Sequence, residues 1–218
     1  MRYSKLLAIL MMGMVFISFP SCNGAFEDIY DEPSANTEST YGFKNVDLDK
    51  HSGTVYINAD SYTRWIYINF HNRTIDSLEI GSQGKEPADW DMAVHRYDSK
   101  VNGVGAMETS FTDLDALMNS GALPSGEFVA DVESKITIDM SGMMEGNIKY
   151  ADSPVNPVLA KWLDVDTSSM PPIYTLSGKV YILKLKDGTY VALKLRDFRN
   201  EKFDKGYLTI DYIYPLEF

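Results

Sequence analysis

The sequence predicts an all-β fold, a sandwich-like antiparallel β domain with one or two short helices. Segments rich in β-branched and aromatic residues recur about every ten residues, and short stretches with Gly, Pro, Asn, Asp or Ser separate them. Only two segments carry the start signals of a helix, and no solenoid or propeller repeat is present. With 218 residues, 44% of them hydrophobic, the chain can bury the core of one such domain.

The first residues predict export. Two basic residues precede an apolar run over residues 6–19, and Cys22 follows shortly afterwards. A short basic segment before an apolar run too short to span a bilayer comfortably is typical of a signal peptide. Because Cys22 is the only cysteine, it cannot form an internal disulfide. We expect cleavage before Cys22 and its lipidation, with residues 19–21 as a relaxed lipobox. A single-span anchor or an ordinary secretory signal is the alternative.

The segment after the cleavage site predicts a tether. Residues 22–50 are rich in acidic and small polar residues and poor in aliphatic ones, which favours a flexible chain. Glu27 and Asp28 resemble the export signal that takes Bacteroidetes lipoproteins to the cell surface. The predicted organisation is therefore a signal peptide over 1–21, the tether over 22–50 and a β domain over 51–218. The expected location is the outer membrane, exposed at the cell surface, with the lipid as the only membrane attachment.

The β domain is predicted to open with strands over 54–59 and 64–70. Residues 71–90 have the Gly, Pro and charge content of a loop. Residues 89–103 carry apolar groups on both alternating faces, which predicts one strand buried on two sides. The glycine-rich residues 103–111 are expected to form a bend.

Two short helices are predicted further along. The first covers residues 112–121, with Thr112 as N-cap and Gly121 just past its end. The second begins at Asn156, with Pro157 in its first helical position.

The C-terminal third is predicted to be all strand. Residues 179–195 form a hairpin around an Asp-Gly pair. A two-residue loop would put Leu183 and Leu193 on opposite faces, so we favour a bulged three-residue loop that aligns them. A charged connection leads to the last strand, which ends at Pro215.

Charge and motif content exclude several function classes. The chain has 31 acidic and 20 basic side chains, so binding to nucleic acid or to an anionic membrane surface is not expected. No zinc-ligand spacing, nucleophile elbow or phosphate-binding loop is present. We therefore predict that the protein is not an enzyme. His95 lies among apolar neighbours and is expected to be structural, with Arg96 and Asp98 as partners.

Four methionines stand out by their positions. Met140, Met143 and Met144 surround a glycine-containing tip between two predicted strands over 136–150, and Met170 precedes two prolines. A thioether is a soft, neutral donor that suits copper(I) or haem iron. Methionine is also flexible packing material, and the residues alone favour packing over ligation.

Three segments resemble the HmuY family of Bacteroidetes haem-binding lipoproteins. They are WDMAVHRYDSKVNG, the region WL…PPIYTLSGKVYIL and the closing KGYLTIDYIYP. The resemblance extends over most of the chain after the tether, from around Thr54 to Pro215. It implies an all-β domain with a pocket between loops for haem b, held non-covalently, and delivery of haem to a TonB-dependent outer-membrane receptor.

The chain departs from the family's porphyromonad prototype at the ligands of the haem iron. The two histidine ligands of that protein correspond to residues 146–147 and Thr167 here, and neither position is histidine. Because Met143 and Met144 lie close to the first position and Met170 to the second, the resemblance implies axial ligation by methionine. Met144 is preferred slightly over Met143. The alternative is a surface lipoprotein that has lost the haem site and binds a glycan or a protein partner.

Overall fold

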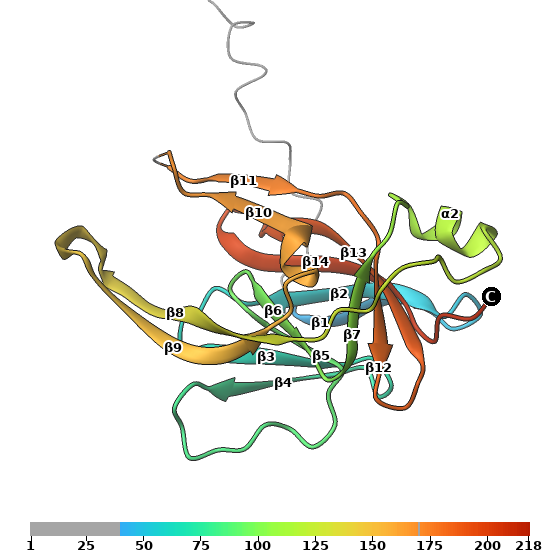
Figure 1. Ribbon diagram of the computed structural model, residues 1–218, viewed down its shortest axis with the longest axis horizontal. Helices are drawn as coiled ribbons and strands as arrows, with labels where there is room; N and C mark the ends of the chain where they lie inside the picture. Colours follow the sequence, from blue (N-terminus) through green and yellow to red (C-terminus); the bar gives the residue numbers. More distant parts are fainter. Residues whose placement is uncertain (1–39, 170) are drawn as a thin grey trace, which may run out of the picture. The chain divides into compact units, whose positions relative to one another are not determined.

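The computed structural model describes residues 40–169 and 171–218 of this protein (Figure 1). The predicted signal peptide, the lipidation site Cys22 and most of the predicted tether lie outside the described residues, as does Met170. No helix in the described ranges has the length and apolar character needed to cross a bilayer.

Antiparallel sheets make up most of the structure, which confirms the all-β prediction. The largest sheet has six strands in the order β1 (Gly42–Asp47), β2 (Ser52–Asn58), β14 (Lys205–Ile213), β13 (Tyr190–Arg199), β12 (Tyr181–Leu185) and β7 (Gly103–Glu108). A second sheet has four strands in the order β4 (Thr74–Glu79), β3 (Arg64–Asn69), β5 (Met92–His95) and β6 (Asp98–Val101). Two further hairpins pair β8 (Val132–Gly142) with β9 (Asn147–Val155), and β10 (Leu163–Asp166) with β11 (Ile173–Leu176).

The main core lies between the six-stranded and the four-stranded sheets. Val55 and Ile57 of β2 belong to the same buried cluster as Ile66 and Ile68 of β3. These four side chains alternate with residues that face away from the core, as expected for sheets packed face to face. The β domain is therefore sandwich-like, as the sequence predicts.

A separate buried cluster fixes the β8–β9 hairpin to the outer face of the four-stranded sheet. Ile136 of β8 and Val155 of β9 pack there with Trp65, Tyr67 and Ala93. As a result all four residues of β5 are buried, two facing the main core and two facing this outer layer. The predicted burial on two sides is therefore confirmed for β5, which is only part of the predicted strand.

Four sequence-based assignments are wrong. The segment over 89–103 is not one strand but the hairpin β5–β6, with Arg96 at a positive φ of 53° in its two-residue turn. β4 lies inside the segment predicted to be a loop, and β7 inside the predicted bend. β1 lies inside the predicted tether and pairs with β2, so the ordered domain begins before residue 51.

Both predicted helices are present in short form. The first is α2 (Leu114–Asn119), capped by Asp113 rather than Thr112, because the Asp113 carboxylate accepts a hydrogen bond from the Ala116 N–H at 3.0 Å. The second is the 3₁₀ turn η2 (Leu159–Trp162). The N–H groups of Val158 and Leu159, at its start, donate hydrogen bonds to the side-chain oxygen of Asn156.

The β12–β13 hairpin has the predicted three-residue loop. Leu183 pairs with Val191, and Tyr181 with Leu193, so the aliphatic residues of both strands share one face. Gly188 has a φ of +88° and closes the loop, a conformation that favours glycine.

Asn156 connects the end of β9 to η2 and is fully buried. Its amide group donates to the Val129 carbonyl and to the Asp131 carboxylate, each at 2.9 Å. Its side-chain oxygen accepts from Val158 N–H at 3.1 Å and from Leu159 N–H at 2.9 Å. One side chain thus holds together the starts of β8 and η2.

We expect Asn156→Ala to lower the free energy of unfolding by about 2–4 kcal/mol, because it removes four hydrogen bonds and leaves buried polar groups unpaired. Urea denaturation measures this difference. Asn119→Ala, at the exposed end of α2, is the control and should change the value by less than about 0.5 kcal/mol. Equal losses in the two variants would contradict the role given to Asn156.

Candidate functional site

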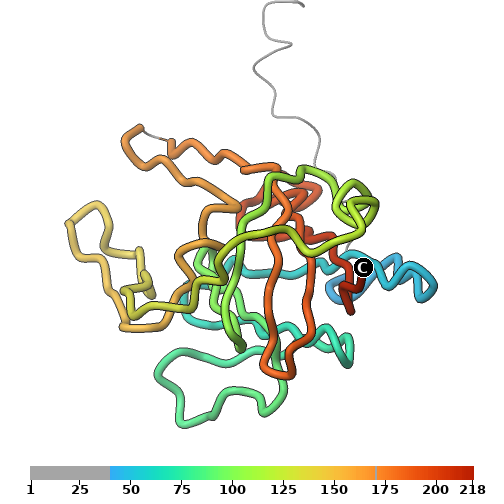
Figure 2. Tube along the Cα trace, turned by 45° about the vertical axis from the view of Figure 1, so that its right-hand side comes forward, coloured from blue at the N-terminus to red at the C-terminus, as the bar shows by residue number. Residues whose placement is uncertain are grey.

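The two methionine-bearing segments are hairpins that project from the same side of the β domain (Figures 1 and 2). They are the β8–β9 and β10–β11 hairpins, and the chain between them contains only Asn156, its neighbours and η2. Two hairpins that follow each other in the sequence can bind one ligand together if the domain holds them at a fixed spacing.

The tip of the β8–β9 hairpin exposes two thioethers. Met143 and Met144 lie in the single 3₁₀ turn η1 (Met143–Glu145), and Gly146 closes it with a φ of +72° and a hydrogen bond to the Met143 carbonyl. The side chain of Met144 is 87% exposed and that of Met143 is 39% exposed. Neither residue fills the core, so packing does not explain Met144. Met140, by contrast, is partly buried within β8.

The β10–β11 hairpin is shorter. Its ladder runs from Leu163 opposite Leu176 to Asp166 opposite Ile173, which leaves residues 167–172 as the loop. Thr167, which the resemblance aligns with a histidine of the porphyromonad prototype, is in this segment, and Met170 lies outside the described residues. The Asp166 carboxylate accepts a hydrogen bond from the Ser168 N–H at 2.8 Å, which orders the start of the loop. The side chain and then the N–H of Ser168 lower the pKa of Asp166.

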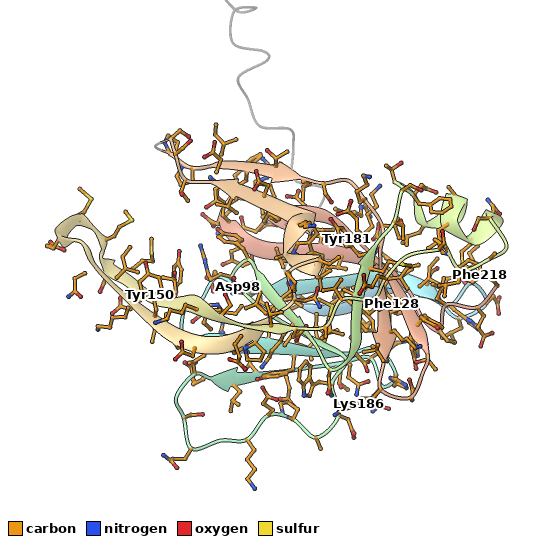
Figure 3. The ribbon with its side chains drawn as sticks, viewed as in Figure 1. Asp98, Phe128, Tyr150, Tyr181, Lys186 and Phe218 are labelled. Atoms are coloured by element: carbon orange, nitrogen blue, oxygen red, sulfur yellow. The ribbon has the colours of Figure 1, made fainter. Side chains whose placement is uncertain are left out.

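The β5–β6 turn and the start of β6 contact both hairpins. The backbone of Ser99, just after the turn, accepts a hydrogen bond from the Asn156 N–H at 2.7 Å, at the end of β9. Tyr97, in the turn, donates a hydrogen bond to the Tyr174 hydroxyl of β11 at 3.2 Å. Figure 3 labels Asp98, which lies next to this turn, and Tyr150, which lies further out on the β8–β9 arm. The turn therefore sets where the two hairpins leave the domain.

Aromatic rings surround this contact. The Tyr97 and Tyr174 rings meet edge to face with centroids 5.3 Å apart, and Tyr174 stacks on Phe198 of β13 at 5.2 Å. Burial, followed by the hydrogen bond to Tyr174, raises the pKa of Tyr97 above its ordinary value. Tyr97 therefore remains protonated at neutral pH and able to donate its hydrogen bond.

Two cations flank the tyrosine pair. The Arg96 guanidinium lies between the rings of Tyr62 and Tyr97, 4.4 and 5.0 Å from their centroids. The Lys205 ammonium lies 4.0 Å from the centroid of Tyr174. Cations at such distances from ring faces are attracted to the π electrons. The roots of the hairpins thus combine aromatic surface with positive charge in a chain that is acidic overall.

Histidine chemistry lies elsewhere in the domain. His95 is fully buried, and its ring contacts the Tyr62 carbonyl at 2.8 Å and the Asp98 carboxylate at 3.4 Å, which supports the predicted structural role. His71 bridges Asp91 and Asp187 at 3.3 and 2.8 Å. Among the described residues, no group of three or more His, Cys, Asp or Glu side chains could hold a metal ion.

Sequence reasoning missed the cluster formed by Arg96, Tyr97, Tyr174 and Lys205. In the sequence, the segment that holds Arg96 and Tyr97 indicated only a resemblance to a family. Its contacts with β11 and β14 cannot be predicted from the spacing of residues along the chain. The exposure of Met144 at a tip was predictable, since glycine residues flank the methionines.

Comparison with known proteins places the chain in a family. The model of the HmuY protein family matches residues 61–212. A search of curated proteins finds no match.

Several solved structures resemble this one. A candidate HmuY-like haem-binding protein from Bacteroides vulgatus is 53% identical, with a TM-score of 0.79, over 82% of this chain and 100% of the other. A candidate lipoprotein from Bacteroides fragilis is 49% identical, with a TM-score of 0.78, over 84% of this chain and 99% of the other. The apo HmuY analogue of Tannerella forsythia is 26% identical, with a TM-score of 0.64, over 74% of this chain and 94% of the other.

The family match covers the β5–β6 turn, both methionine-bearing hairpins and most of the last strand, so it includes the whole candidate site. The matched structures share the all-β architecture over nearly their full length. The chain belongs to the HmuY family.

Proposed function

We propose that this protein binds haem b non-covalently between the β8–β9 and β10–β11 hairpins, with methionine thioethers as axial ligands. Family membership supports haem as the ligand. The observation that carries the ligand assignment is the 87% exposure of Met144 at a hairpin tip, where packing does not account for it. Met170, which follows Ser169 in the sequence, is the proposed second ligand.

The residues present fit a haem group. Thioethers bind haem iron without losing a proton, and the aromatic side chains near the hairpin roots offer apolar surface to a flat ring. No histidine or cysteine lies in either hairpin to compete for the iron. Met144 is preferred over Met143 because it is the more exposed of the two, and Met143 serves as the alternative.

A soft, neutral donor pair favours the ferrous state, because it does not offset the additional charge of ferric iron. Haem supplies the iron centre, and the protein supplies donors, apolar walls and a fixed spacing between the hairpins. We propose a binding and delivery role in haem acquisition rather than catalysis, with a TonB-dependent outer-membrane receptor as recipient.

Lipidation of Cys22 is proposed to anchor the protein in the outer membrane with the β domain exposed at the cell surface. The similarity to a candidate lipoprotein from Bacteroides fragilis supports this location. The second candidate function, binding of a glycan or protein partner, is favoured by one observation, namely that both positions of the family's histidines hold other residues.

We expect wild-type domain titrated with haem under dithionite to give a low-spin spectrum with a shifted Soret band. Met144→Ala should weaken ferrous binding at least about tenfold, because one axial bond is lost. Met143→Ala should keep wild-type binding, and Met118→Leu, in α2, is a control for methionine content.

Absence of a Soret shift in either redox state for the wild type would exclude haem binding and favour the second candidate function. Unchanged binding in a combined Met143, Met144 and Met170 alanine variant would exclude only the ligand assignment.

We also expect that a histidine at position 144 would provide a stronger ligand for ferric iron. Met144→His introduces a donor that supports ferric iron, so ferric haem should bind more tightly than in the wild type, and this binding should weaken as the pH falls below about 6.5 and the imidazole is protonated. Absorption spectra of the ferric complex between pH 5 and pH 8 measure both effects. A ferric spectrum identical to that of the wild type would place residue 144 away from the iron.

Cys22→Ser should abolish incorporation of a fatty-acid label and move the full-length chain from the membrane fraction to the soluble fraction. Protease treatment of intact cells should remove the wild-type β domain if it faces the medium. A membrane-bound Cys22→Ser variant would show that the N-terminal segment acts as a spanning anchor instead.

A further inference from the structure

Arg96 and Lys205 lie at opposite ends of one aromatic contact. Arg96 belongs to the β5–β6 turn and Lys205 is the first residue of β14, yet both are next to the hydrogen-bonded pair of Tyr97 and Tyr174. Both cations are half-buried. The pair joins the β5–β6 turn to the β10–β11 hairpin, one residue pair from the loop over residues 167–172.

Neither cation forms all the polar interactions that it can make. Arg96 donates to the Asp60 carbonyl and to the Tyr97 hydroxyl, but its buried Nε has no hydrogen-bond partner. Within residues 40–169 and 171–218, neither Arg96 nor Lys205 forms an ion pair with a carboxylate. A half-buried cation without a counter-charge is unfavourable in the free protein and becomes favourable when an anion binds.

The nearby carboxylates are engaged with other groups. Asp60 accepts a hydrogen bond from the Tyr207 hydroxyl at 3.3 Å and lies 3.9 Å from the Arg64 guanidinium. Asp98 faces His95, and Asp204 accepts from the side chain of Asn200 at 2.9 Å. None of these carboxylates forms an ion pair with Arg96 or Lys205 in the described residues.

The position of Arg96 is closely defined. Its backbone adopts the left-handed conformation, and its guanidinium packs against Gly206, where a Cβ atom would come within 2.9 Å of Arg96 Nη1 and 2.8 Å of Asp60 Cα. Gly206 leaves the space that this cation occupies. A cation held in this way presents a fixed charge to a ligand rather than a mobile one.

We propose that Arg96 and Lys205 bind the two propionate carboxylates of haem and so determine which edge of the ring faces the domain. The inference rests on the proposed function. A haem ring bound between the hairpins could place its acidic edge beside these cations and the Tyr97–Tyr174 pair. Charge-assisted hydrogen bonds in a partly buried site are stronger than neutral ones, and the Arg fork matches a carboxylate. The preferred ligand class is therefore a dicarboxylic tetrapyrrole.

The experiment compares ferrous haem with its neutral dimethyl ester in the full mature chain, using Lys205→Gln and Arg96→Gln. We expect each variant to bind haem roughly tenfold more weakly, to bind the ester as the wild type does, and to retain the low-spin spectrum. Lys202→Gln replaces an exposed lysine in the segment just before β14 and controls for net charge. It should change the affinity for neither haem nor its ester.

The outcomes separate this inference from the proposed function. Equal affinity of the wild type for haem and its ester, or unchanged haem affinity in both variants, would overturn the role of the two cations and leave haem binding intact. An equal loss for both ligands would assign Arg96 and Lys205 a purely structural role. A wild type that binds neither ligand would overturn both proposals. If Arg96→Gln fails to fold, Lys205→Gln alone decides, because Lys205 lies on the surface of the Tyr174 ring rather than in a packed turn.

Discussion

The arrangement of the candidate site depends on Asn156. This one buried side chain connects the segment before β8 to the start of η2, and its backbone N–H bonds to β6. The β8–β9 hairpin ends at it, so this residue fixes the root of that hairpin and the start of the turn η2 that leads to the β10–β11 hairpin. Because an amide satisfies two acceptors and two donors at once, no aliphatic residue of similar size could replace it without leaving buried backbone groups unpaired.

The four-stranded sheet is the platform on which this arrangement rests. β5 is buried on both faces because the main core covers one and Ile136 and Val155 of the β8–β9 hairpin cover the other. The root of the hairpin is therefore part of the hydrophobic structure, whereas its outer half carries exposed residues such as Tyr150 and Met144. Burial of apolar area stabilises the root, and the tip remains available for a ligand.

Much of the fold could be predicted from local chemistry, and the site only in part. Alternating apolar residues predicted the strands, and the Asp-Gly turn together with the faces of Leu183 and Leu193 predicted the register of the β12–β13 hairpin, which is confirmed. β4 was missed because its residues are mostly exposed and polar, so its pairing with β3 decides its conformation. The β5–β6 turn was missed because Arg96 adopts a positive φ that its residue type does not indicate. The methionine tip could be found from the sequence, but the contact between Tyr97 and Tyr174, 77 residues apart, could not.

The base of the β8–β9 hairpin is buried and its tip is exposed, so the two ends would hold haem differently. The β8–β9 ladder contains two irregularities in register, and beyond Ile136 none of its residues up to Met144 is fully buried. A hairpin arm with so little burial cannot hold a thioether rigidly, so the iron–sulfur bonds alone would give a loosely held ligand. Tight binding then requires contacts at the better-ordered end of the site, where aromatic rings and cations are already fixed by β5, β6, β13 and β14. On this argument the methionines determine the redox preference of the site and supply part of its affinity, and the contacts made by Arg96, Lys205 and the two tyrosines supply the rest.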